Sequence, residues 1–332
     1  MCGEQGLVGV EVGDTEIGKV VESFNLIKGV VGMKKIFKWI GIIVGALVGL
    51  ILVVGGVLYL MGNARLNKTY DFPPANIVIP ADAASIEFGR HRVESLCAGC
   101  HGEDLSGIEN WFDGGPLGTM DSANLTSGEG GIGDEYTAED YVRAIRHGID
   151  RDGKPIFMAA VVSTAYLSDE DLGSIISYLQ TIPSVDHVTT GVNFTPLATV
   201  MFAAGVLGNM PVEDVSHEVN VSAVERGVSV EYGEYLININ DCRICHGQDL
   251  AGGPFPNPTI KKISPNLTPG GELGFWTEAQ FVTTIRTGVT PSGYEMDPEL
   301  MSWTSYRLFY DDELKAIWVY LQSLPKLAQY TE

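Results

Sequence analysis

Two short motifs in this sequence each combine a pair of cysteines with a histidine. Cys97-Ala98-Gly99-Cys100-His101 and Cys242-Arg243-Ile244-Cys245-His246 both have the spacing C-x-x-C-H. One helical turn carries the two thiols to the two vinyl groups of a haem, and the adjacent histidine reaches the iron from the proximal side. We therefore predict two covalently bound haem c groups, attached through Cys97, Cys100, Cys242 and Cys245, with His101 and His246 as iron ligands.

Zinc binding and thiol redox chemistry are the alternatives. A structural zinc site generally takes further ligands from a second pair of residues, whereas each motif offers one Cys pair and one His. A thioredoxin-like C-x-x-C lies in a βαβ context, which the surrounding pattern does not indicate. Haem attachment is the preferred interpretation, and both alternatives stay open at this point.

The segments around the motifs form a repeat. Further segments match in the same order: Cys-His-Gly-x-Asp-Leu-x-Gly at 100–107 and 245–252, Asn-Leu-Thr at 124–126 and 266–268, Ile-Arg-x-Gly at 145–148 and 285–288, and Tyr-Leu-Gln-x-x-Pro at 178–183 and 320–325. Each copy has about 100 residues, an ordinary domain size. We predict an all-α fold with domains at 83–183 and 227–332. The linker between them, 184–226, contains an apolar run that we expect to cover one or both domains.

Short helices must position the motifs. The pattern predicts helices at 85–96 and 230–241, directly before the two motifs. Thr137 and Thr277 are predicted N-caps of the middle helices, and Ser168 is predicted to open the last helix of the first copy. Because short helices joined by long loops make a poor core, we expect a buried porphyrin to supply the missing apolar volume.

The shared elements resemble those of membrane-anchored di-haem cytochromes c, and they are similar to the cytochrome c subunits that accompany membrane-bound dehydrogenases. The resemblance covers roughly residues 83–332. It implies two tandem cytochrome c-like domains. It also implies that Gly89 and Gly233, on the first helix of each copy, allow close approach by Tyr178 and Tyr320 on the last helices.

Methionines are the predicted sixth iron ligands. Met301 precedes Ser302 where the family usually has a proline, and Met296 is the runner-up. Met158 is the only methionine between the helix of Arg146 and the last helix of the first copy. We predict Met158 and Met301 as ligands, which raises the haem potential relative to a second histidine. The alternative is that both fill the core.

The remaining histidines are weaker candidates. Thr287 is the counterpart of His147, so a ligand role shared by both copies is not expected there. We expect His91, on the first helix, to be a surface group. His187 and His217 lie in the linker, and either could still ligate iron.

Two other residue types recur in register with the haem motifs. Arg146 and Arg286 are predicted to neutralise haem propionates through charge-assisted hydrogen bonds, although each could be a solvated cation at a helix C-terminus. Asn124 and Asn266 each begin a glycosylation sequon. Their recurrence favours a structural loop beside the haem instead.

An apolar segment precedes the repeat. Residues 40–61 carry no charge, and such a helix extends roughly 33 Å, enough to cross a bilayer. We predict a transmembrane anchor at 36–61 and a linker at 62–82. Alternatives are a cleaved signal peptide and a core helix. The region 1–32 is interpreted as an extension upstream of a start at Met33, or as a cytoplasmic tail.

The anchor and its flanking charges predict the location of the protein. Lys34, Lys35 and Lys38 precede the apolar segment, so we expect a single-pass protein of the cell membrane with a cytoplasmic N-terminus. The haem domains would then lie on the periplasmic or extracytoplasmic side.

Composition excludes two classes of protein. The chain has 42 acidic and 21 basic residues and a net charge of −21, which opposes binding to nucleic acid. Five cysteines are too few for a disulfide scaffold. The chain after Arg65 contains 37 acidic and 15 basic residues and is therefore strongly negative. This charge would steer a basic partner, or serve solubility alone.

The predicted function is electron transfer, not catalysis. Two haems with His and Met ligands leave no open position for a substrate, and no small-molecule site is evident. The expected partners are redox proteins, such as a membrane dehydrogenase or a respiratory complex. Alternatives are a di-haem peroxidase, which needs one haem with an opening position, and a Cys-ligated sulfur oxidoreductase, for which only Cys2 remains.

Overall fold

A computed structural model of the chain describes residues 14–331 apart from 74, 159 and 257–259, with side chains from residue 34 onward. The chain divides into two units, Met1–Leu60 and Met61–Glu332. Residues 1–13 of the predicted extension or tail lie outside the described part.

The first unit consists largely of helix α1 (Asp14–Leu66), which continues into the second unit. Its segment Lys34–Leu66, 33 residues long, is the one helix in the described residues that is long and apolar enough to cross a membrane. The predicted anchor at 36–61 lies inside it. Apolar side chains such as Ile51 and Leu52 are 67% and 70% exposed, which argues against the alternative of a core helix.

The second unit is mostly helical. Its helices in the first copy of the repeat are α2 (Ala83–Leu96), α3 (Ala98–His101), α4 (Ala138–Val142), the π-helix η2 (Arg143–His147), α5 (Val161–Thr164) and α6 (Asp169–Leu179). The linker contains α7 (Pro196–Ala203) and α8 (Pro211–Asp214). The second copy contains α9 (Val230–Ile239), α10 (Cys242–His246), the 3₁₀ helix η3 (Glu272–Phe275), α11 (Glu278–Thr287), α12 (Trp303–Tyr306) and α13 (Asp311–Ser323).

Two small sheets accompany the helices. Strands β1 (Phe112–Asp113), β2 (Gly118–Met120) and β3 (Val192–Phe194) form one antiparallel sheet around the 3₁₀ helix η1 (Gly115–Leu117). Strands β4 (Gly253–Pro254) and β5 (Ile263–Ser264) form the other. The prediction of an all-α fold therefore describes the architecture coarsely and misses these strands.

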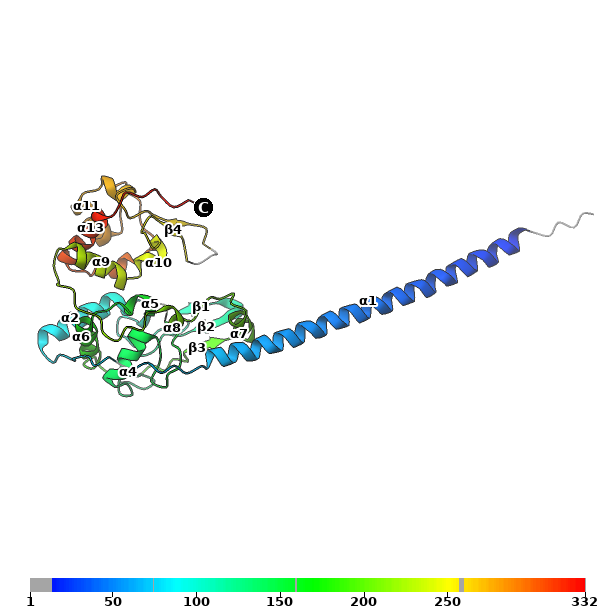
Figure 1. The fold of residues 1–332 in the computed structure, drawn as a ribbon, viewed down its shortest axis with the longest axis horizontal. Helices are drawn as coiled ribbons and strands as arrows, with labels where there is room; N and C mark the ends of the chain where they lie inside the picture. Colours follow the sequence, from blue (N-terminus) through cyan, green and yellow to red (C-terminus); the bar gives the residue numbers. More distant parts are fainter. Residues whose placement is uncertain (1–13, 74, 159, 257–259, 332) are drawn as a thin grey trace, which may run out of the picture. The chain divides into compact units, whose positions relative to one another are not determined.

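Close helix pairs organise both copies, α2 with α6 and α9 with α13 (Figure 1). A Cβ added to Gly89 would lie 1.9 Å from the Ser174 carbonyl oxygen, and one added to Gly233 would lie 2.1 Å from that of Ala316. The same atoms would meet Tyr178 and Tyr320 at 3.0 and 2.7 Å. The close approach implied by the resemblance is confirmed, because any side chain larger than hydrogen would separate the helices.

Local capping follows the sequence closely. Thr137 and Thr277 each form a capping box with the residue three positions later, and the Ser168 hydroxyl accepts from the Asp171 backbone N–H at 3.1 Å. The first helix of the second copy is shorter than predicted. It ends at Ile239, and Asp241 has a left-handed φ of 58°. That backbone break re-orients the chain before the second haem motif.

Candidate haem sites

The first haem motif directly follows α2. Cys97 is the C-cap of α2, and the next helical turn, α3, carries Cys100 and His101. The Nδ1 atom of His101 lies 2.8 Å from the carbonyl oxygen of Ala123. Donation to this carbonyl places the imidazole proton on Nδ1 and leaves Nε2 free for a metal.

The second motif repeats this geometry. It forms α10, and the Nδ1 atom of His246 lies 2.8 Å from the carbonyl oxygen of Pro265. Ala123 and Pro265 immediately precede the two Asn-Leu-Thr loops. The recurring loop thus fixes the tautomer and orientation of the predicted proximal histidine in each copy.

The loop asparagines hold these loops in place. The side-chain amides of Asn124 and Asn266 donate to the carbonyls of Val185 and Leu327, both at 2.8 Å. Their oxygens accept from backbone N–H groups two residues later, at 2.9 and 2.8 Å. Both asparagines are buried, so the structure supports the structural role over glycosylation.

Burial favours the neutral forms of the motif residues. Burial, and to a smaller extent a neighbouring negative group, raises the pKa of the Cys97 and Cys242 thiols to about 12. Burial lowers the pKa of His101 and His246, so each imidazole is neutral near pH 7, as a metal ligand must be. Within the described residues, no group of three His, Cys, Asp or Glu side chains is placed to hold a metal ion.

The predicted methionine ligands occupy matching positions. Met158 is half-buried just before α5, and Met301 is half-buried just before α12, where it packs against the main core. Trp303 stacks over the glycine that ends α11, and its indole N–H donates to the Met296 carbonyl at 3.1 Å. Iron ligation by Met158 and Met301 stays a prediction.

Both recurring arginines contact the start of the last helix. Arg146 donates to the carboxylate of Asp169 and to the carbonyl of Leu167, both at 2.7 Å. Arg286 donates to the carboxylate of Asp311 at 2.7 Å and to a backbone carbonyl of the preceding loop. The Nε–H of Arg146 is buried and has no hydrogen-bond partner among the residues that the structure describes. The ion pairs were not foreseen from the sequence, and the propionate role stays a prediction.

His91 is not the surface group that the sequence suggested. It is 4% exposed, and its Nε2 lies 2.7 Å from the carboxylate of Glu313 in the second copy. The expectation was wrong because Glu313 reaches α2 only through tertiary contact. Elsewhere, His147 and His217 have their Nδ1 atoms 3.2 Å apart, and His187 contacts the Ser106 carbonyl.

The same contact surface contains a buried ionic cluster that sequence reasoning missed. Arg92 is fully buried and donates to Glu313 at 2.7 Å, to Asp171 at 3.2 Å and to the hydroxyl of Tyr232 at 2.8 Å. The Tyr235 hydroxyl donates to Asp171 at 2.8 Å. Burial opposes the charge of Arg92, but the two carboxylates outweigh it and keep its pKa above the ordinary value. Asp171 and Glu313 occupy equivalent positions in the two copies of the repeat. This recurrence of an acidic residue was the one signal in the sequence that could have pointed to the cluster.

A second shared feature lies beside both haem motifs. The Asp241 carboxylate, next to Cys242, accepts a hydrogen bond from Ser163 of the first copy. Burial and then the charge of Asp241 raise the pKa of Cys100 in the first motif and of Cys245 in the second. The two attachment segments therefore approach each other at Asp241.

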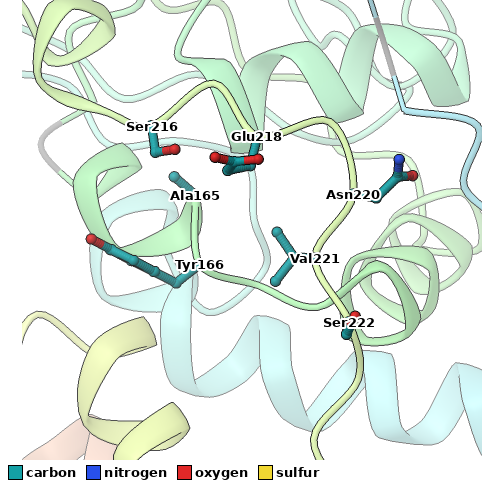
Figure 2. A pocket seen from close by; sticks show the side chains of 7 residues that line it. All are labelled: Ala165, Tyr166, Ser216, Glu218, Asn220, Val221 and Ser222. Carbon is teal, nitrogen blue, oxygen red and sulfur yellow. The ribbon is translucent and has the colours of Figure 1, made fainter.

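A cavity of about 300 Å³ lies apart from the haem motifs. It is lined by Ala165, Tyr166, Ser216, Glu218, Asn220, Val221 and Ser222. In Figure 2 the Glu218 carboxylate lies near Ala165 and Ser216, while the ring of Tyr166 points away. None of the predicted haem ligands lines this cavity.

Known proteins are similar to this chain in sequence. Residues 84–179 match the family described as Cytochrome C oxidase, cbb3-type, subunit III. The cytochrome subunit of fructose dehydrogenase from Gluconobacter japonicus is 29% identical over 303 residues, which cover 82% of this chain and 58% of that protein. The chain is homologous to cytochrome c subunits of membrane-bound dehydrogenases.

Other relatives agree with this homology. The cytochrome c subunit of quinone alcohol dehydrogenase from Gluconobacter oxydans is 27% identical over 75% of this chain and 56% of that protein. That of gluconate 2-dehydrogenase from Pantoea cypripedii is 36% identical over 25% of this chain and 19% of that protein. The chain thus spans a little over half the length of the first two relatives. Covalently bound haem c is confirmed as the cofactor, and the peroxidase alternative finds no support.

Proposed function

We propose that this chain is a membrane-anchored di-haem cytochrome c that transfers electrons and has no catalytic activity of its own. The supporting observation is that one geometry occurs twice: a C-x-x-C-H turn whose histidine donates Nδ1–H to the carbonyl before an Asn-Leu-Thr loop, at 2.8 Å in both copies. In this proposal residues 83–183 and 227–332 are tandem cytochrome c-like domains.

Each domain has the residues to hold and tune one haem, which supplies a one-electron redox couple when bound. Two cysteines anchor it, and His101 or His246 ligates the iron. Met158 or Met301 would supply the second protein ligand to the iron, which would raise the potential. The unpartnered Nε–H of Arg146 is available to a propionate.

The domains are arranged to exchange electrons with each other. Cys100 of the first motif and Cys242 of the second both lie near enough to the Asp241 carboxylate for its charge to raise their pKa values. A Cβ added to Gly99, inside the first motif, would lie 3.6 Å from the Ser305 hydroxyl of α12 in the second domain. These contacts favour direct passage between haems over two independent carriers.

The proposed electron donor is the catalytic subunit of a membrane-bound dehydrogenase, and the proposed acceptor is a respiratory component of the same membrane. The names of the relatives support the donor. The 37 acids and 15 bases after Arg65 favour a basic docking surface on one partner, with contacts that weaken as salt rises.

We also propose that α1 is a retained anchor, not a cleaved signal. Its last turn is part of the second unit, where Gly62 packs against Thr199 and Arg65 pairs with Glu213. Cleavage after Arg65 would remove both residues and leave their partners without these contacts. The lysines before the apolar segment then place the N-terminus in the cytoplasm and the haem domains outside.

The proposal is tested by producing the chain in a host that attaches haem c and counting haems in the purified protein. We expect two per chain, one after Cys97→Ala/Cys100→Ala, and one after the matched change Cys242→Ala/Cys245→Ala. A redox titration should show two one-electron steps. Addition of hydrogen peroxide should cause no catalytic turnover. Turnover of peroxide, or one haem in the unmodified chain, would contradict the proposal. Co-purification in mild detergent identifies the dehydrogenase.

A further inference from the structure

An uncharged stretch stands out in the acidic second unit. Residues 188–212 contain no Asp, Glu, Lys or Arg, although the chain after Arg65 carries 37 acids and 15 bases. The stretch forms β3, α7 and the turn that leads to α8. Leu197 on α7 and Val206 in the turn are 49% and 64% exposed. An apolar surface that the fold leaves uncovered points to contact with another apolar phase.

This stretch is fixed against the end of the proposed anchor. The predicted anchor in α1 ends at Met61, and the first charged residue after it is Arg65. A Cβ on the next residue, Gly62, would lie 2.1 Å from the Thr199 carbonyl oxygen, so the backbone of α7 touches α1 at this point. One turn further along, the Arg65 guanidinium donates to the Phe202 carbonyl at 3.1 Å and pairs with Glu213. The chain therefore enters the second unit in contact with α7, directly after the segment proposed to cross the membrane.

The neighbouring sheet exposes further apolar groups. Phe112 and Val192 both lie opposite Met120 in the register of the β1–β2–β3 sheet, so the three side chains share one face. Phe112 and Val192 are 46% and 39% exposed, and Trp111, next to β1, is 43% exposed. These strands adjoin α7 (Figure 1). Aromatic side chains of this kind concentrate where proteins meet the membrane interface.

We propose that α7, the turn at Val206 and the adjoining β1–β3 sheet rest on the lipid bilayer, with Leu197 and Val206 in the boundary between headgroups and acyl chains. This inference rests on the proposed anchor. Acidic surfaces are repelled by anionic lipids, and the uncharged stretch is free of that repulsion. Apolar area in contact with the interface adds binding energy. The surface would hold the haem domains at one orientation to membrane partners.

The inference is tested with nitroxide labels in the full haem-loaded chain, reconstituted into vesicles that contain anionic lipid. Cys2→Ser removes the remaining free thiol. Single cysteines are then introduced as Val206→Cys, as Phe275→Cys and as Leu50→Cys. Phe275 is 90% exposed in the second domain and serves as the water control. Leu50, within the charge-free segment of α1, serves as the lipid control. Collisions with oxygen, which concentrates in lipid, are compared with those of a water-soluble nickel chelate.

We expect the label at 206 to resemble the label at 50, with oxygen collisions dominant, and to differ from the label at 275. A label at 206 that behaves like the one at 275, while 50 reports lipid, overturns the inference and leaves the anchor intact. A label at 206 that neither reagent reaches means that protein covers the surface, which also overturns it. A label at 50 in water contradicts the anchor and this inference together.

Discussion

Removing the positive charge of Arg92 tests how the two copies of the repeat are held together. Arg92 is 0% exposed and lies between the Asp171 and Glu313 carboxylates, whose side chains are 5% and 3% exposed. Arg92→Met keeps much of the side-chain volume and leaves both carboxylates without their shared cation. Breaking a buried ion pair in this way costs about 3–5 kcal/mol. His91 and Arg226 still contact these carboxylates, so we expect the lower end of that range.

The adjacent arginine provides a matched control. Arg90 lies on the same helix and pairs with Glu87 and Glu94, but its side chain is 41% exposed. Because solvent screens such pairs, Arg90→Met should cost about 0–1 kcal/mol. Both substitutions remove one guanidinium from α2, so the difference between them isolates burial.

The assay is denaturant unfolding of the haem-loaded protein, followed by circular dichroism and by haem absorbance. Arg92→Met should lower the free energy of unfolding far more than Arg90→Met. It should also separate the unfolding transitions of the two copies of the repeat, since the cluster joins them. The triple variant Arg92→Met/Asp171→Asn/Glu313→Gln should recover part of the loss, because no buried charge is left unpaired. Equal effects of Arg92→Met and Arg90→Met would refute the reasoning.

Three further outcomes are expected. Acidification should loosen the same cluster. Burial alone would raise the pKa of Glu313, but the hydrogen bond from His91 and the charge of Arg92 outweigh burial and hold this pKa below its ordinary value of 4.5. Its stabilisation is present above pH 4.5 and is lost as the pH falls through the lower folded pKa, so an unfolding series that shows no such loss, or an identical loss in Glu313→Gln, would count against it. Gly233→Ala should prevent α9 from approaching α13, because the new Cβ would lie 2.1 Å from the Ala316 carbonyl oxygen; a thermal scan with unchanged midpoint would contradict this. Met301→Ala should abolish the weak long-wavelength absorption of a methionine-ligated ferric haem and lower one midpoint potential, whereas Met296→Ala should leave both unchanged; the reverse result would assign the ligand to Met296.

The sequence by itself determined the chemistry of this protein. Covalent haem attachment depends on local spacing, and both C-x-x-C-H turns form short helices as predicted. The N-caps at Thr137 and Thr277 were also readable, because each depends on residues near in sequence. The close approach at Gly89 and Gly233 was implied by the family resemblance, and the structure confirms it. The repeat predicted a structural role for the Asn-Leu-Thr loop. Only the structure showed that the carbonyl just before this loop lies within hydrogen-bond distance of the histidine of each motif.

Tertiary structure decided how the copies meet. His91 and Arg92 look like ordinary charged positions on a surface helix, and only their distance to Glu313, 222 and 221 positions away in sequence, makes them a buried cluster. Arg146 and Arg286 likewise find their carboxylates through folding. The spacing of Cys and His residues along the chain specifies that a C-x-x-C-H turn can bind haem. Which charges share a buried environment depends on long-range packing, and no local pattern records it.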